Sequence, residues 1–143
     1  MKILIVEDEE LAVKKLRGLL QEAKPDAEVL ADLDSIESTV EWLNGNPSPD
    51  IILMDIEMPV VNGLQGVKLV KKQYPHIKII MQTAFDDDDK IFAALQAGAE
   101  GYILKTASII QIAQSIDEVI KGGASMSPSI ALKVMRYFSR QQL

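Results

Sequence analysis

Ile51-Ile52-Leu53-Met54-Asp55 is a run of four apolar residues that ends directly in a carboxylic acid. An apolar run with no alternation of polar residues is typical of a strand buried on both faces of a parallel sheet. Short runs of similar character occur at Lys2–Val6, Glu28–Ala31, Ile77–Met81 and Tyr102–Leu104. These runs predict five strands, and the run that ends in Asp55 is predicted to be central.

Longer amphipathic segments separate the runs and predict helices. They lie at Glu9–Ala23, from Ser35 to about Asn44, from about Leu64 to Pro75, from the acidic run 86–89 to Gly98, and at Ile109–Ile120. Alternation of strands and helices predicts a parallel sheet with helices on both faces, because right-handed crossovers place the helices there. A final amphipathic segment, from Ser127 to about Arg140, predicts one extra helix at the C-terminal end.

Composition excludes several classes of protein. The 143 residues fit one compact domain, with a net charge of −6 and a pI near 4.8. Surfaces that follow nucleic-acid phosphates or anionic lipid need clustered positive charge, so we expect no direct binding to nucleic acid or membrane. The chain has no cysteine, which excludes disulfides, thiolate metal sites and a cysteine nucleophile. We find no signal peptide and no membrane-spanning run, and expect a cytoplasmic protein.

Polar residues follow the predicted strands at the points where they end. Glu7 and Asp8 follow the first strand, Asp55 the third, Thr83 the fourth and Lys105 the fifth. Since ligands of open α/β sheets bind beyond the carboxyl ends of the strands, these side chains are expected to converge. Three neighbouring carboxylates repel one another unless a cation joins them, and Mg²⁺ prefers such oxygen ligands. Asp55 is then placed as a nucleophile toward phosphorus.

Five short motifs surround these strand ends. They are Ile3-Leu4-Ile5-Val6-Glu7-Asp8-Glu9, Asp50-Ile51-Ile52-Leu53-Met54-Asp55-Ile56-Glu57-Met58-Pro59, Asn62-Gly63, Thr83-Ala84 and Ala97-Gly98-Ala99-Glu100-Gly101-Tyr102-Ile103-Leu104-Lys105. Together they resemble the receiver domain of two-component response regulators, and the likeness extends from Met1 to about Gly122. The resemblance implies a flavodoxin-like, three-layer α/β sandwich. The sheet would have five parallel strands in the order 2-1-3-4-5, with five helices and the extra C-terminal helix.

The resemblance assigns a metal site around the phosphoacceptor. Asp55 would accept the phosphoryl group, and Mg²⁺ (or Mn²⁺) would be held by Asp8, Asp55 and the backbone carbonyl of Glu57. Glu7 would complete the acidic pocket, either directly or through a metal-bound water.

The same likeness assigns the residues that bind and sense the phosphoryl group. Lys105 and Thr83 would contact its oxygens, while Thr83 and Tyr102 would act as switch residues. Glu57 and Phe85 flank the path of a hydrolytic water, so they are expected to tune the rate of dephosphorylation, with a sign that stays open. Thr106 stands where the family often has proline, and the isomer of the preceding bond is also left open.

The implied function is that of a switch rather than an enzyme, with only self-phosphorylation and slow self-dephosphorylation. A sensor histidine kinase would donate the phosphoryl group. The face made by the helix near 88–97, the strand 102–104 and the helix 109–120 would then change its preference for partners, including a second copy.

The expected domain organisation is a receiver at 1–122 followed by a linker and extra helix at 123–143, with no output domain. The tail 122–131 resembles receivers that precede a LuxR-type (NarL-like) helix-turn-helix, whereas the N-terminal half, in the segment 34–50, resembles receivers of LytTR-type regulators. The chain is therefore interpreted as a stand-alone receiver or as the regulatory domain of a transcriptional regulator, and the amphipathic extra helix favours the second interpretation. Such a regulator would contact DNA only through its output domain.

Two alternatives use the same kind of sheet. A haloacid-dehalogenase-like phosphohydrolase would also use Asp55 as nucleophile, but it expects a second Asp where this chain has Glu57. A flavodoxin-like FMN binder needs a Ser/Thr/Gly-rich loop after the first strand. The acidic residues 7–10 would instead repel phosphate there.

Overall fold

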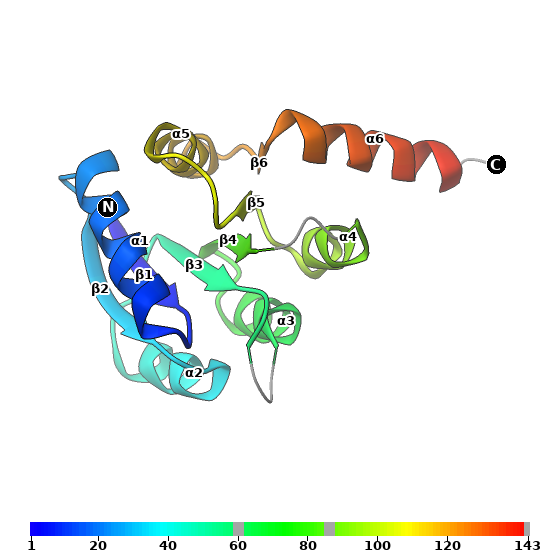
Figure 1. Cartoon of the computed structure of the whole chain (residues 1–143). Helices are drawn as coiled ribbons and strands as arrows, with labels where there is room; N and C mark the ends of the chain where they lie inside the picture. Colours follow the sequence, from blue (N-terminus) through cyan, green and yellow to red (C-terminus); the bar gives the residue numbers. More distant parts are fainter. Residues whose placement is uncertain (59–61, 85–87, 142–143) are drawn as a thin grey trace.

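The computed structural model of the protein describes residues 1–58, 62–84 and 88–141. Its strands form one sheet in the order β2-β1-β3-β4-β5-β6, and every neighbouring pair is parallel (Figure 1). In chain order the elements are β1 (Lys2–Val6), α1 (Glu10–Ala23), β2 (Glu28–Leu33), α2 (Ile36–Gly45), β3 (Ile51–Asp55), α3 (Gly63–Gln73), β4 (Lys78–Thr83), α4 (Asp88–Ala97), β5 (Gly101–Leu104), α5 (Ile109–Ile120), β6 (Ser125–Met126) and α6 (Pro128–Gln141).

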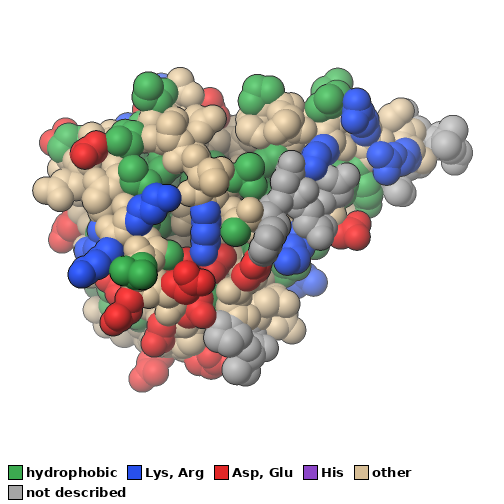
Figure 2. Space-filling view, in the orientation of Figure 1, with side chains coloured by type: hydrophobic (Ala, Val, Ile, Leu, Met, Phe, Trp, Pro, Cys, Tyr) green, Lys and Arg blue, Asp and Glu red, His purple; other side chains and the backbone are tan. Residues whose placement is uncertain are grey.

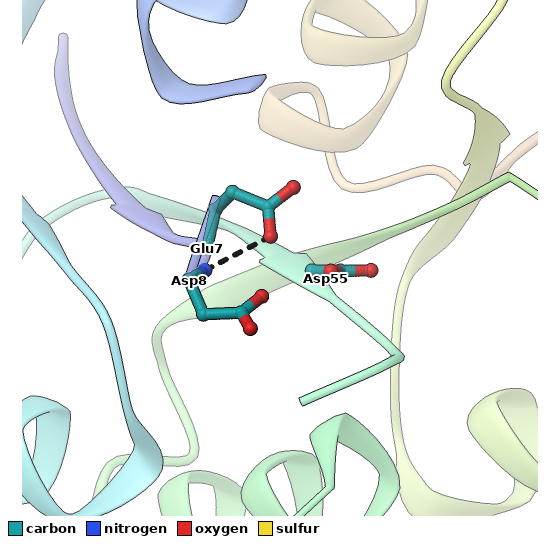
Figure 3. Close-up of side chains that lie close together, drawn as sticks. All are labelled: Glu7, Asp8 and Asp55. Carbon is teal, nitrogen blue, oxygen red and sulfur yellow. Dashed lines mark hydrogen bonds between the residues drawn. The ribbon is translucent and has the colours of Figure 1, made fainter. Parts of the chain in front are cut away.

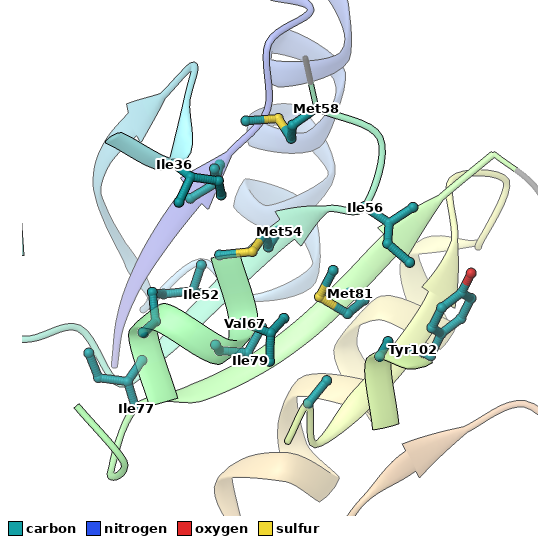
Figure 4. Close-up of a cluster of buried hydrophobic side chains, with 14 of the residues drawn as sticks. Ile36, Ile52, Met54, Ile56, Met58, Val67, Ile77, Ile79, Met81 and Tyr102 are labelled. Carbon is teal, nitrogen blue, oxygen red and sulfur yellow. The ribbon is translucent and has the colours of Figure 1, made fainter. Parts of the chain in front are cut away.

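Helices cover both faces of the sheet, as the unbroken apolar runs predict. Ile3 and Ile5 of β1 belong to the core under α1 and α5, whereas Leu4 and Val6 belong to the core under α2, α3 and α4. Figure 4 shows part of this second core. Successive residues of a strand point to opposite faces, so a strand that is covered on both sides is apolar at most of its positions. The three-layer α/β prediction is confirmed.

The prediction of five strands is wrong by one, because β6 adds a sixth at the edge next to β5. Its register pairs Gly101 with Ser125 and Tyr102 with Met126. A hydrogen bond between the buried hydroxyls of Ser115 and Ser125, 2.5 Å long, ties β6 to α5. Two residues are too short to show a hydrophobic period, so the sequence carries no signal for this strand.

The extra C-terminal helix is present as α6 and packs against α4. Ile130 is 1% exposed, and the rings of Phe92 and Tyr137 stack with their centroids 4.2 Å apart. The residues after β5 are therefore packed into the same core as the sheet. In the part of the chain that the structure describes, no helix is both long enough and apolar enough to cross a bilayer.

Close packing at the end of β3 makes Gly63, the first residue of α3, sensitive to substitution. A Cβ atom there would lie 2.4 Å from the carbonyl oxygen of Asp55 and 2.7 Å from the Cα of Ile56. We expect Gly63→Ala to lower the free energy of unfolding by about 1–3 kcal/mol, since backbone must move to admit the methyl group. Urea denaturation followed by circular dichroism measures this change.

Gly18 supplies the matched control because it lies inside α1, and a Cβ there would meet nothing within 4 Å apart from its chain neighbours and the backbone of its own helix. Gly18→Ala is expected to raise the free energy of unfolding by about 0.5–1 kcal/mol, since alanine favours the helix. If both substitutions changed the free energy of unfolding equally, the lack of space around Gly63 would not be the cause of its sensitivity.

Candidate functional site

Three carboxylates meet at the carboxyl ends of the central strands. Glu7 and Asp8 follow β1, and Asp55 is the last residue of β3. One oxygen of each lies within 4.8 Å of the others (Figure 3). Glu7 and Asp55 are 5% and 3% exposed, whereas Asp8 is exposed. Figure 2 shows acidic side chains gathered on this edge of the molecule.

Lys105 brings a positive charge to this cluster from the end of β5. Its ammonium lies 2.6 Å from a carboxylate oxygen of Glu7 and 3.3 Å from one of Asp55. The backbone N–H of Lys105 also donates to the carbonyl of Thr83 over 2.7 Å, which fixes its backbone beside the end of β4. One cation thus contacts two buried carboxylates, and the group remains acidic overall.

Burial and mutual repulsion change the proton affinities of this cluster. Burial, together with the adjacent Glu7 carboxyl, raises the pKa of Asp55 to about 7. Partial loss of solvent around its carboxyl and the same neighbour, Glu7, also raise the pKa of Asp8, although the residue as a whole is exposed. Burial opposes ionisation of Glu7, but its contacts with Asp55 and Lys105 outweigh this and lower its pKa. Burial of Lys105 likewise acts against its charge, yet Glu7 and Asp55 raise its pKa above the ordinary value.

The donor set fits a hard divalent cation. Carboxylate oxygens are the preferred protein ligands of Mg²⁺, which usually keeps one or two carboxylates together with water. Glu7, Asp8 and Asp55 supply such oxygens, and an added cation would relieve the repulsion that raises the pKa of Asp55. Within residues 1–58, 62–84 and 88–141, this is the one cluster of three or more His, Asp or Glu side chains with that geometry.

Thr83 and Glu57 are linked to each other beside the cluster. The backbone N–H of Glu57 donates to Oδ1 of Asp55 over 3.1 Å. The carboxylate of Glu57 accepts a hydrogen bond from the hydroxyl of Thr83, also 3.1 Å long. It is in addition 3.3 Å from the ammonium of Lys90, which belongs to α4. The sequence did not point to Lys90, since nothing in it indicates which side of α4 faces Glu57.

The other residues that the sequence analysis singled out lie away from the carboxylate cluster or outside the residues that the structure describes. Tyr102 is fully buried in the core under α2, α3 and α4 (Figure 4), and Met126 packs against the same core. Phe85 lies outside the described residues, as does the start of the acidic run 86–89. The bond between Lys105 and Thr106 is trans, since the described chain has no cis peptide.

A groove of about 260 Å³ opens beside the cluster, between α1 and α5. Glu7 and Lys105 line this groove, as does the exposed Leu11 of α1. Gln82 of β4 also lines it and was missed from the sequence, because it lies inside a strand rather than after one.

Comparisons with known proteins show the family of the chain. The sequence model of the family described as "Response regulator receiver domain" matches residues 3–117. The transcriptional regulatory protein LnrK of Bacillus subtilis is 34% identical over 142 residues, which cover 99% of this chain and 64% of LnrK. LiaR of the same organism is 35% identical over 135 residues, which cover 94% of this chain and 63% of LiaR. The chain thus spans less than two thirds of the length of these relatives.

Solved structures share the fold. A LuxR-family two-component response regulator from Aurantimonas sp. SI85-9A1 superposes with a TM-score of 0.88 at 24% identity, covering 96% of this chain and 97% of that one. The isolated REC domain of RcsB from Salmonella enterica serovar Typhimurium, solved with the phosphomimetic BeF3−, gives a TM-score of 0.82 at 19% identity and covers 93% and 97%. The flavodoxin-like prediction is confirmed. Since the family match includes the whole acidic cluster and most of the chain, this protein belongs to the response regulator receiver domain family.

Proposed function

We propose that this chain takes a phosphoryl group from the phosphohistidine of a sensor histidine kinase onto Asp55. The observation that carries the proposal is the placement of three carboxylates within 4.8 Å of one another, with Lys105 in contact with two of them. A buried carboxylate that lies beside other carboxylates and contacts one lysine is suited to attack phosphorus when a cation is present.

The reaction forms one bond and breaks one. An oxygen of Asp55 attacks the phosphorus, the bond between phosphorus and the histidine nitrogen breaks, and that nitrogen keeps the electron pair. Lys105 offsets the charge on the phosphoryl oxygens, and Thr83 offers a hydroxyl donor at the same edge. Mg²⁺ (or Mn²⁺) held by Asp8, Asp55 and the backbone carbonyl of Glu57, with Glu7 nearby, would supply charge neutralisation when bound.

The output is proposed to be a change in the face formed by α4, β5 and α5. In this change Thr83 would move first and Tyr102 would move in response to it. Glu57 and Phe85 are the residues proposed to set the rate of the slow self-dephosphorylation. In solution, phosphorylation is proposed to favour a homodimer through the changed face.

The wider setting is proposed to be that of a cytoplasmic transcriptional regulator. Its receiver would be residues 1–122, followed by a linker helix, and DNA would be contacted only by an output domain beyond this chain. Relatives named as transcriptional regulators support this, and the tail supports a LuxR-type output. The likeness of residues 34–50 to LytTR-type regulators stays a prediction.

Intact-mass spectrometry tests the phosphoacceptor. After incubation with acetyl phosphate and Mg²⁺, we expect one added phosphoryl group per chain. The adduct should be absent from Asp55→Asn and from samples treated with a chelator, since the variant lacks the attacking oxygen and the chelator leaves the carboxylates unneutralised.

Two other outcomes contradict the proposal. Steady release of phosphate that depends on Asp55, with no adduct, would favour the haloacid-dehalogenase-like hydrolase. Neither adduct nor release would indicate a receiver that signals without phosphate.

A further inference from the structure

Glu57 joins three parts of the molecule through one carboxylate oxygen. Its Oε1 accepts from the hydroxyl of Thr83 at the end of β4 and lies 3.3 Å from the ammonium of Lys90 in α4. Its backbone N–H donates to Asp55. The side chain of Glu57 thus connects the segment that follows Asp55 with both β4 and α4.

The two arms of this link differ in their surroundings. Thr83 is fully buried, so the acceptor of its hydroxyl has a strong influence on where that hydroxyl points. The side chains of Lys90 and Glu57 are 40% and 34% exposed. An ion pair so open to solvent contributes weakly and is displaced easily by a stronger acceptor.

A phosphoryl group on Asp55 would be such an acceptor. It carries close to two negative charges and three acceptor oxygens, and it would arise two residues away from Glu57. The new charge would repel the Glu57 carboxylate and compete with it for the hydroxyl of Thr83 and the ammonium of Lys90.

We propose that Glu57 is a positioning residue, whose carboxylate holds Thr83 and α4 in their unphosphorylated arrangement. Phosphorylation of Asp55 then breaks both contacts, so the carboxylate opposes the switch that it borders. This inference rests on the proposed function for the role of phosphorylation, but the two contacts themselves exist in the unphosphorylated chain.

The consequence of release extends beyond α4 to the C-terminal helix. Phe92 lies two residues after Lys90, and its ring stacks on Tyr137 of α6. Gln96 of α4 also lies 3.5 Å from the hydroxyl of Tyr137. A change in the position of α4 therefore reaches α6 through direct contacts.

Amide hydrogen exchange of the unphosphorylated protein tests the resting contacts. We expect Glu57→Ala to speed exchange in α4 by about three- to tenfold, the size of effect that loss of an exposed ion pair and one hydrogen bond allows. Lys90→Ala should speed it similarly, and the double variant should add little. Additive effects, or unchanged exchange in Glu57→Ala, would overturn the proposal. Glu22→Ala, an exposed glutamate of α1, is the matched control.

Binding of beryllofluoride in the presence of Mg²⁺ is a second measurement. A substitution that only damages the fold would weaken this binding, whereas the proposal expects it to become tighter. Removal of a competing acceptor should let Glu57→Ala bind the phosphomimetic about three- to tenfold more tightly than the wild type. Glu57→Gln should lie between them, since it keeps an acceptor for Thr83 but loses the charge. Weaker binding by Glu57→Ala would assign it a merely structural role. If the wild type binds no beryllofluoride, the proposed function fails, while the exchange experiment still decides whether Glu57 holds α4.

Discussion

Lys105→Met is expected to slow the phosphorylation of Asp55 by acetyl phosphate by about 100-fold or more, the cost of removing one preorganised donor to a reacting oxyanion. The ammonium of Lys105 lies between Glu7 and Asp55, where the phosphoryl oxygens would bring further negative charge. Methionine keeps a side chain of similar length but offers no charge. Mass spectrometry of the adduct over time gives the two rates.

Loss of the lysine also leaves two buried carboxylates without their cation, so the variant should be less stable. Its fold must therefore be verified by circular dichroism before the rates are compared. Lys14→Met, which removes an exposed charge from α1, controls for the change in net charge. A rate for Lys105→Met within about threefold of the wild type would contradict a role for this ammonium in the transfer.

Asp55→Asn is expected to stabilise the protein in the absence of divalent cations. Burial and Glu7 raise the pKa of Asp55 to about 7 from 3.8, so its ionised form is unfavourable in the fold. Each unit of pKa corresponds to 1.36 kcal/mol, and the gain at pH 8 is therefore about 2–4 kcal/mol after local relaxation. Thermal and urea denaturation of both proteins in a chelating buffer measure it.

The pH dependence of this gain follows from linkage. Between about pH 4 and pH 7 the unfolded chain has already released the Asp55 proton, whereas the folded protein still holds it. The free energy of unfolding of the wild type therefore falls as the pH rises through this range, and the advantage of Asp55→Asn grows. It should be small near pH 4 and constant above about pH 8.

With Mg²⁺ present, the wild type should become more stable than Asp55→Asn. The wild type has one more carboxylate to bind the cation, and tighter binding stabilises the folded state more. Asp26→Asn, at an exposed position before β2, should change stability by less than about 0.5 kcal/mol. A variant Asp55→Asn that is less stable than the wild type at pH 8 without metal would show that the cluster is not strained by its charges.

The fold was predictable where hydrophobic patterns are long or unbroken. β3 lies fully inside the sheet, so every residue from Ile51 to Met54 is apolar, and α5 repeats its apolar stripe over three turns. β4 ends at Thr83, two residues later than its apolar run, because Gln82 continues the ladder with a polar side chain. β6 could not be predicted, since it is held by pairing with β5 and by Ser115 rather than by its own pattern.

The acidic cluster was predictable because its geometry follows from topology alone. Parallel strands end at one edge, so residues at or directly after the ends of β1, β3 and β5 must meet there. The contact between Glu57 and Lys90 depends on the rotation of α4 and on side-chain rotamers, neither of which has a local sequence signal. Such contacts emerge only from the packed structure.

The pairing of β6 with β5 has a consequence for modular recombination. A genetic exchange that joined a new output module at Gly122 would remove β6, leave the outer backbone of β5 unpaired and open the core position of Ile130. Bare strand edges template association between chains. A chimeric regulator should therefore keep this chain intact through the end of α6, with the new module joined after Gln141.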